Sequence, residues 1–173
     1  SKLYRTGKFN QNNFSVNGNE IAWGTIGNAS TSEGIFWESM NAIGVHQVPA
    51  VVSVWDDNYG ISVDNEYQTI KSSISEALAG FQKDDNSNGY EILTVNGWDY
   101  PKLISTYEYA NNICRKKHIP VLIHVKELTQ PIGHSTSGSH ERYKTEERLA
   151  WEKKYDCNHM MRKWILKNGI SDE

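Results

Sequence analysis

The chain has 173 residues, of which 38% are hydrophobic and 23% charged, and its formal net charge is −3. That length suits one domain, and the apolar share is enough to bury a core, which argues against a wholly disordered chain. With 18 basic and 21 acidic residues, the composition offers no electrostatic basis for binding nucleic acid or an anionic membrane surface. No apolar run approaches the roughly 20 residues of a membrane span, so none is predicted.

Two features of the sequence indicate a cytoplasmic protein. The segment Ser1–Arg5 lacks the apolar stretch of a secretory signal. The two cysteines, Cys114 and Cys157, have neither metal-type spacing nor the density of a disulfide framework, which favours a reducing compartment.

Regular structure is predicted from residue 20 onward, after an irregular lead-in over residues 1–19 that is rich in Asn and Gly. Short apolar or β-branched runs that end at turn residues predict buried strands at 21–26, 50–55, 90–95 and 120–125. Helical spacing of apolar residues predicts helices after the capping residues 30–33, over 67–81, and over 102–117 behind an Asp99 N-cap. A polar loop at 129–141 precedes a charged tail, 143–168, that is predicted to be helical.

The alternation of strands and helices predicts the fold class. It is typical of an α/β protein with a mostly parallel sheet sandwiched by helices, here followed by a helical C-terminal tail. No repeat or long linker divides the chain, so a single domain over 1–173 is expected.

Two turns carry the candidate chemistry, because open α/β sheets bind ligands at the carboxyl ends of their strands. The turn after the first strand, Gly27–Gly34, offers backbone amides to a phosphate at a helix N-terminus. The turn after the second, Asp56–Gly60, presents carboxylate and amide oxygens, which Mg²⁺ prefers. Asn28 and Asp57 could therefore clamp a metal–diphosphate between neighbouring strands. The plain alternative is that both segments are ordinary polar turns.

The residues in these turns resemble a known family. Residues 27–41 and 48–62 are similar to the thiamine-diphosphate motif in the alpha chain of 2-oxoacid dehydrogenase decarboxylating components. The matching positions are Gly27, Ser32, Glu33, Gly34, Glu38, Asn41, Tyr59, Ile61 and Ser62. Further matches lie at 95–99, 120–123, Glu127, 133–137, 142–143 and 146–147. The resemblance therefore spans nearly the whole chain from Glu20.

The resemblance implies a thiamine-diphosphate-binding fold that holds thiamine diphosphate and Mg²⁺. By this likeness the cofactor-binding residues are Gly27, Asn28, Ala29, Ser30, Tyr59, Ile61 and His134. The metal ligands would be Asn28, Asp57 and the backbone carbonyl of Tyr59. His134 is the expected catalytic residue, on a loop at the mouth of the site, with Ser135 as its loop-ordering companion. The alternative for His134 is a solvated loop histidine.

Several positions depart from the family pattern. Asn28 stands where the family has its metal-binding Asp, and Asp57 where it has its ligand Asn, so the exchange is reciprocal and the charge is kept. This predicts that Asn28→Asp alone disturbs metal binding and that adding Asp57→Asn restores it. Gln130 and Trp55 replace arginines, and Ala29 adds a Cβ where the backbone approaches phosphate.

The resemblance implies an enzyme that decarboxylates a 2-oxoacid and passes the acyl group to a lipoyl arm. The beta chain or beta portion would complete the site, and a lipoyl-bearing acyltransferase would accept the product, within a homo- or hetero-oligomer. The string at 134–137 favours 2-oxoisovalerate. Because the family's alpha chain is longer, the 173 residues are expected to be part of a longer chain. The alternatives are a non-catalytic or excised domain that serves assembly, and a transketolase-like enzyme.

Overall fold

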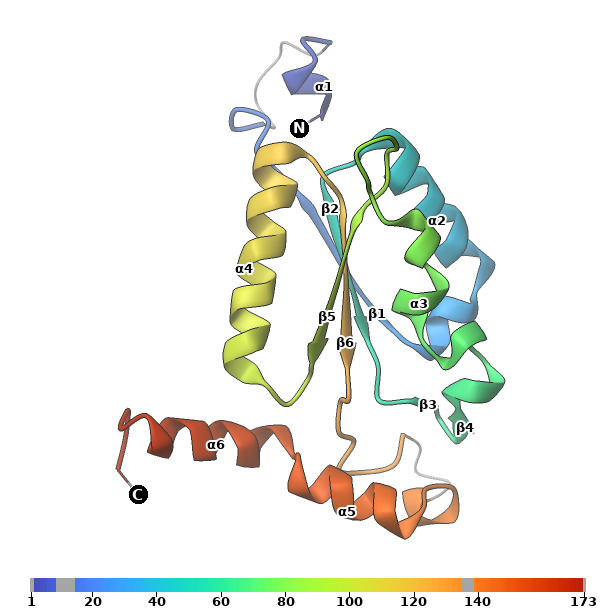
Figure 1. Cartoon of the computed structure of the whole chain (residues 1–173), viewed down its shortest axis with the longest axis vertical. Helices are drawn as coiled ribbons and strands as arrows, with labels where there is room; N and C mark the ends of the chain where they lie inside the picture. Colours follow the sequence, from blue (N-terminus) through green and yellow to red (C-terminus); the bar gives the residue numbers. More distant parts are fainter. Residues whose placement is uncertain (1, 9–14, 135–138, 173) are drawn as a thin grey trace.

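A four-stranded parallel sheet forms the centre of the computed structural model, which describes residues 2–8, 15–134 and 139–172 (Figure 1). Its strands are β1 (Ala22–Gly27), β2 (Ala50–Trp55), β5 (Glu91–Asn96) and β6 (Val121–Lys126). They lie in the order β1-β2-β6-β5, and every neighbouring pair is parallel. The predicted parallel sheet is confirmed.

Helices cover both faces of this sheet. Figure 1 shows α2 (Gly34–His46) and α3 (Ile74–Ala77) on one face and α4 (Tyr100–Lys117) on the other. The chain steps along the sheet in one direction from β1 to β2 and to β5, and then back from β5 to β6. Because parallel crossovers are right-handed, the reversal places α4 on the opposite face from α2 and α3.

The two faces carry separate cores. The core under α4 consists of Val51, Val95, Ala110, Ile113, Cys114, Val121, Ile123 and Val125. The core under α2 and α3 consists of Phe36, Met40, Val54, Ile74, Leu78, Tyr90 and Leu122. Alternate residues of β6 contribute to the two cores, as expected for a central strand buried on both faces.

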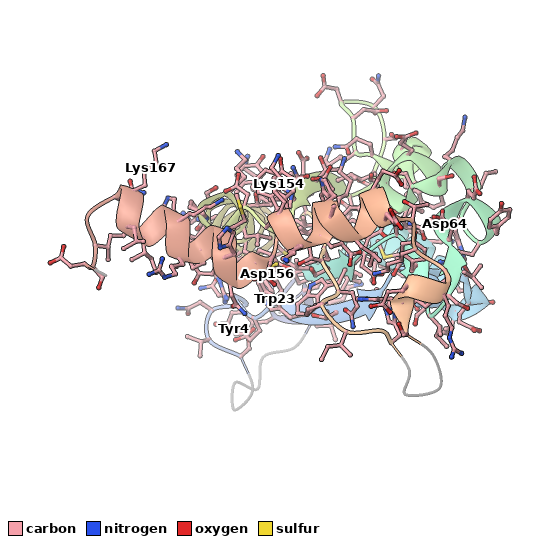
Figure 2. All side chains as sticks on the ribbon, turned by 90° about the horizontal axis from the view of Figure 1, so that it is seen from below. Tyr4, Trp23, Asp64, Lys154, Asp156 and Lys167 are labelled. Carbon is pink, nitrogen blue, oxygen red and sulfur yellow. The ribbon has the colours of Figure 1, made fainter. Side chains whose placement is uncertain are left out.

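The helical C-terminal tail predicted over 143–168 is confirmed, and it consists of two helices, α5 (Glu146–Lys154) and α6 (Cys157–Lys167). The break has a local cause, because Asp156 is the N-cap of α6 and its Oδ1 accepts a hydrogen bond from the His159 amide at 2.9 Å. Both helices lie beyond the carboxyl ends of the strands (Figure 1). Figure 2, seen from that side, shows them stretching across the molecule as far as Lys167.

Two of the predicted elements are wrong in part. The first strand was expected to be buried, but β1 is the edge of the sheet and most of it is exposed, with Trp23 48% accessible. The predicted helix over 67–81 is broken into short pieces: the 3₁₀ turns Asn65–Tyr67, Ile70–Ser72 and Ala79–Phe81, and α3 itself. Lys71 and Ser72 have φ values of 63° and 50°, a left-handed conformation that interrupts an α-helix.

The N-terminal segment packs against the end of α4. The short helix α1 (Lys2–Arg5) places the Arg5 guanidinium where it donates to the carbonyls of Arg115 at 2.7 Å and Lys116 at 3.2 Å. A cation is favourable there because the last carbonyls of a helix carry partial negative charge. Within the described ranges, no helix has the length and apolar character needed to cross a membrane.

Candidate functional site

The turns after β1 and β2 meet at one edge of the sheet. Because Gly27 pairs with Trp55, the residues that follow the two strands are neighbours, and the Asn28 amide donates to the Trp55 carbonyl at 3.0 Å. Asn28 is 5% exposed and Asp57 is 7% exposed. The fold therefore brings together the two side chains that the sequence predicts for metal binding.

The Asn28 side chain is a hydrogen-bond donor on two sides. Its Nδ2 lies 3.2 Å from the Tyr59 carbonyl oxygen and 2.9 Å from Oδ1 of Asn65. The carbonyl of Asn28 accepts from the Thr31 hydroxyl at 2.6 Å, at the start of the 3₁₀ turn Ala29–Ser32. The residues 30–33 were expected to cap helix α2 with a hydroxyl group, and this is wrong. The N-cap of α2 is Glu33, which makes no side-chain cap hydrogen bond, and the Ser32 hydroxyl donates to the Gln68 carbonyl instead.

Asp57 has one oxygen that is bonded and one that is not. Its Oδ1 accepts from the Tyr59 amide at 3.2 Å. Its Oδ2 is buried and, within the described part of the chain, has no hydrogen-bond partner, although His134 Nε2 lies 3.1 Å away. Burial raises the pKa of Asp57, and the nearby His134 opposes that rise. A buried carboxylate oxygen in this state is suited to bind a cation.

A second carboxylate in the same turn is fully occupied. Asp56, 3% exposed, accepts from the Asn58 amide at 2.8 Å and from Asn65 Nδ2 at 2.9 Å and 3.1 Å. Its Oδ2 also lies 2.8 Å from His124 Nε2, and Nδ1 of that ring lies 2.8 Å from the Ser75 hydroxyl. This buried network joins the end of β2 to β6 and to the segment before α3.

Helix α5 and Lys144, just before it, add a cluster of charged residues that lies against the turn. Lys144 and Arg148 both pair with the buried Glu152, at 2.8 Å each, and both lie over the Tyr59 ring. Arg148 Nη2 also donates to the Asp57 carbonyl at 2.8 Å. The cluster therefore holds the backbone of the Asp57–Tyr59 turn from the side of the C-terminal tail.

The remaining predicted site residues lie around this centre. Ala29 packs against Gly60 in the hairpin of β3 (Tyr59–Gly60) and β4 (Val63–Asp64), so closely that a Cβ at Gly60 would lie 2.8 Å from Ala29 Cβ. Gly27 and Ser30 are exposed, and Ile61 is 60% exposed with a φ of 57°. Ser135 lies outside the described residues.

Trp55 and Gln130, the two positions where an arginine was expected from the family pattern, lie in different surroundings. Trp55 is 52% exposed, and its indole Nε1 donates to the Ser53 hydroxyl at 3.1 Å. Gln130 lines a cavity of 590 Å³ between the loop after β6 and the helices α5 and α6, together with His140 and His159. Asn28 and Asp57 do not line that cavity.

The donor set at the edge of the sheet fits a hard cation. Asp57 offers a carboxylate oxygen, Tyr59 a carbonyl with a second lone pair, and Asn28 its Oδ1. In the described ranges no group of three or more His, Cys, Asp or Glu side chains could hold a metal. A cation here would therefore depend on amide and backbone oxygens and on oxygens of its ligand, which is typical of Mg²⁺ with a phosphate.

Comparison with known proteins places the chain in a family. Residues 13–173 match the family described as Dehydrogenase E1 component. The chain belongs to this family, which is an enzyme family dependent on thiamine diphosphate, and its members include alpha-type chains of 2-oxoacid dehydrogenases.

The named relatives are alpha subunits. The chain is 27% identical over 153 residues to the 2-oxoisovalerate dehydrogenase subunit alpha of Bacillus subtilis, and the aligned region covers 88% of this chain and 44% of that protein. It is 28% identical over 153 residues to the pyruvate dehydrogenase E1 component subunit alpha of Mycoplasma pneumoniae, with 87% and 40% covered. The Staphylococcus aureus pyruvate dehydrogenase E1 component subunit alpha is 26% identical over 158 residues, with 90% and 40% covered. The chain thus spans less than half the length of these relatives.

Sequence reasoning missed Asn65, the Asp56–His124 pair and the cluster on α5. A signal existed for His124, because a histidine inside the apolar strand β6 must find a hydrogen-bond partner when buried. His124 is 1% exposed and meets that need with Asp56 and Ser75, which the sequence pattern does not identify. Asn65 gave no signal, since an asparagine in a polar turn segment is unremarkable by pattern.

Proposed function

We propose that this chain is the alpha-type part of a 2-oxoacid dehydrogenase decarboxylating component and helps to bind Mg²⁺ and thiamine diphosphate. The observation that carries the proposal is the buried Oδ2 of Asp57, which has no hydrogen bond among the described residues and only His134 Nε2 nearby at 3.1 Å, in a chain of the E1 family. Such an oxygen gains most from a cation, because burial has removed its water.

In this proposal three residues hold the metal and their neighbours hold the cofactor. Asn28 Oδ1, an Asp57 carboxylate oxygen and the Tyr59 carbonyl bind Mg²⁺. The backbone of Gly27–Ser30 faces the diphosphate, and the exposed side chain of Ile61 gives the organic part of the cofactor an apolar contact. When bound, thiamine diphosphate supplies the carbanion stabilisation that decarboxylation requires, and the protein contributes binding, orientation and electrostatics.

His134 is proposed as the catalytic residue, with Ser135 beside it. An imidazole can donate or accept a proton near neutral pH, which suits a group at the mouth of an acyl-transfer site. Its position 3.1 Å from Asp57 Oδ2 supports this role, because the loop that carries it reaches the proposed metal centre.

The substrate and the partners follow from the named relatives. We propose 2-oxoisovalerate as substrate, in line with the relative from Bacillus subtilis, and a lipoyl-bearing acyltransferase as acceptor of the acyl group. The named relatives are alpha subunits, which supports a beta chain or beta portion as the partner that completes the site, in a homo- or hetero-oligomer. A cytoplasmic location is proposed on the same basis.

A decarboxylation assay tests this function. The enzyme assembled with its beta portion is given 2-oxoisovalerate, pyruvate and a sugar phosphate in turn, each with Mg²⁺ and thiamine diphosphate, and CO₂ release is measured. We expect release from 2-oxoisovalerate to exceed that from pyruvate, and none from the sugar phosphate. Carbon transfer between sugar phosphates would favour the transketolase-like alternative, and no turnover with any substrate would favour a role in assembly.

A further inference from the structure

The side chains around Asn28 form a series of hydrogen bonds in which each direction is determined. The Tyr59 carbonyl can only accept, so the Asn28 atom 3.2 Å from it must be the Nδ2 amino group. The same amino group lies 2.9 Å from Asn65, which must therefore present Oδ1. Asn65 in turn directs its own Nδ2 at the Asp56 carboxylate, 2.9 Å and 3.1 Å from the two oxygens.

Asn65 is held in this orientation from every side. It is 3% exposed, and its Oδ1 also accepts from Gln68 Nε2 at 3.1 Å. The Asp56 carboxylate that it faces is kept in place by His124 Nε2 at 2.8 Å, and His124 itself is 1% exposed. A flip of the Asn65 amide would place its oxygen against a buried carboxylate, which costs the hydrogen bond and adds repulsion.

We propose that Asn65 is a positioning residue whose orientation is fixed by Asp56. In this orientation Asn65 favours an amide over a carboxylate at position 28, so that Asp57 supplies the carboxylate of the cation site. A carboxylate at position 28 would put oxygen against two acceptors, the Tyr59 carbonyl and Asn65 Oδ1. The amide of Asn28 satisfies both with Nδ2 and keeps only Oδ1 for a cation. This inference rests on the proposed metal–diphosphate site and adds to it the residues that decide which ligand carries the charge.

The proposal changes what an exchange of the two ligands should do. The pair Asn28→Asp with Asp57→Asn restores the charge but leaves the new carboxylate facing Asn65 Oδ1. Adding Asp56→Asn removes the constraint, because an amide at position 56 can donate to Asn65 Oδ1. Asn65 can then turn its Nδ2 toward position 28, which reverses the bonds of Asn65 to positions 28 and 56. Only the Tyr59 carbonyl, which cannot donate, still faces the new carboxylate.

The first test needs no metal. Thermal unfolding midpoints are measured in a chelator for the wild type, Asn28→Asp, Asp57→Asn, the double variant that combines these two changes, and the triple variant that also carries Asp56→Asn. We expect Asn28→Asp to lower the midpoint relative to wild type, and the double variant to unfold below Asp57→Asn alone. The triple variant should recover part of that loss. The control is Asn112→Asp on the exposed face of α4, which adds the same charge and should leave the midpoint unchanged. A double variant as stable as Asp57→Asn alone would overturn the proposal.

The second test measures the affinity for Mg²⁺ in the presence of thiamine diphosphate, with the beta portion assembled. We expect Asn65→Leu and the double exchange to bind Mg²⁺ about tenfold to a hundredfold more weakly than wild type, and the triple exchange to recover. Unchanged affinity in Asn65→Leu would overturn the positioning role. If the wild type itself fails to bind Mg²⁺, the proposed function is wrong, and the unfolding series still decides the wiring of Asn65.

Discussion

Nε2 of His134 lies 3.1 Å from Oδ2 of Asp57. The residue predicted for catalysis and the residue predicted to carry the metal's charge therefore occupy one corner of the site, although 77 positions separate them in the sequence. The loop after β6 returns to the turn after β2, because these two strands are neighbours in the sheet. This proximity affects the charge of Asp57, because His134 opposes the rise that burial imposes on the pKa of Asp57.

The raised pKa of Asp57 predicts how stability depends on pH. A carboxyl whose pKa is raised by folding contributes stability below its unfolded pKa, and that stability is lost as the pH rises through its folded pKa. We therefore expect Asp57→Asn, measured by denaturant unfolding without metal, to increase the free energy of unfolding at neutral pH. The gain should vanish in acid, where Asp57 is protonated.

Asp84 supplies the control of opposite sign. Its pKa is lowered by hydrogen bonds from the Asn86 amide and from Ser87, so its charged form is favoured in the folded chain. Asp84→Asn should give no gain at neutral pH. If Asp57→Asn lowers the free energy of unfolding as much at neutral pH as in acid, the buried charge of Asp57 does not destabilise the folded chain.

Gly60 predicts a packing effect at the cofactor turn. A Cβ there would lie 2.6 Å from Gln68 Oε1 and 2.8 Å from Ala29 Cβ, which forces the hairpin away from the turn after β1. We expect Gly60→Ala to destabilise the protein by about 1–3 kcal/mol in chemical denaturation. Adding Ala29→Gly should recover part of the loss.

A matched glycine separates packing from backbone effects. Gly24, in β1, has nothing within 4 Å of a built Cβ, so Gly24→Ala should be tolerated. Equal losses at Gly24 and Gly60 would contradict the close approach of the two turns.

The buried ion pair of Lys144 and Glu152 predicts an asymmetric result. The Lys144 side chain is 0% exposed and its Nζ lies 2.8 Å from Glu152 Oε1. Glu152→Leu leaves the buried Lys144 without a counter-charge, so it should cost about 3–5 kcal/mol of unfolding free energy. Lys144→Met should cost less, because Glu152 keeps Arg148 at 2.8 Å. Lys144→Met with Glu152→Leu should cost less than Glu152→Leu alone, and Lys153→Met, on the exposed side of α5, should cost little. A double variant that loses the sum of the two single losses would show that the pair is not coupled.

Replacing His134 is expected to lower the catalytic rate with little loss of affinity for Mg²⁺. If it transfers a proton at the mouth of the site, His134→Ala should lower kcat of the assembled enzyme by about 10²- to 10⁴-fold. The affinity for Mg²⁺ should stay close to that of wild type, because His134 is not among the proposed metal ligands. His159→Ala, on the exposed side of α6, should leave kcat unchanged. A weaker cofactor affinity with normal kcat would reassign His134 to binding.

The parallel sheet was predictable because its strands are short apolar runs, separated by segments whose apolar residues recur at helical spacing. The order of the strands was not predictable, since no local feature of the sequence specifies that β6 lies between β2 and β5. The exposure of β1 has the same origin: its residues are apolar enough for a buried strand, and only its place at the edge leaves Trp23 accessible. The broken helix at 67–81 shows apolar spacing overridden by left-handed backbone at Lys71 and Ser72.

The candidate site was predictable where motif and topology agree. Asn28, Asp57 and Tyr59 follow neighbouring strands, so their meeting could be expected from the alternation of strands and helices. The partners that orient them could not, because Asn65 and His124 reach the site through crossovers that the sequence does not specify. The predicted reciprocal exchange concerned only positions 28 and 57. The structure adds a third residue, Asn65, whose hydrogen bond to Asn28 an exchange of the two ligands would also have to satisfy.

The central claim is that Asp57 carries the charge of an Mg²⁺–thiamine diphosphate site. Calorimetric titration of the assembled enzyme with thiamine diphosphate and Mg²⁺ tests it most directly, with wild type, Asp57→Ala and the exposed control Asp85→Ala compared. We predict saturable binding that requires Mg²⁺ in the wild type and in Asp85→Ala, and no measurable binding in Asp57→Ala. Equal binding by wild type and Asp57→Ala, or none by the wild type with the beta portion present, would contradict the claim.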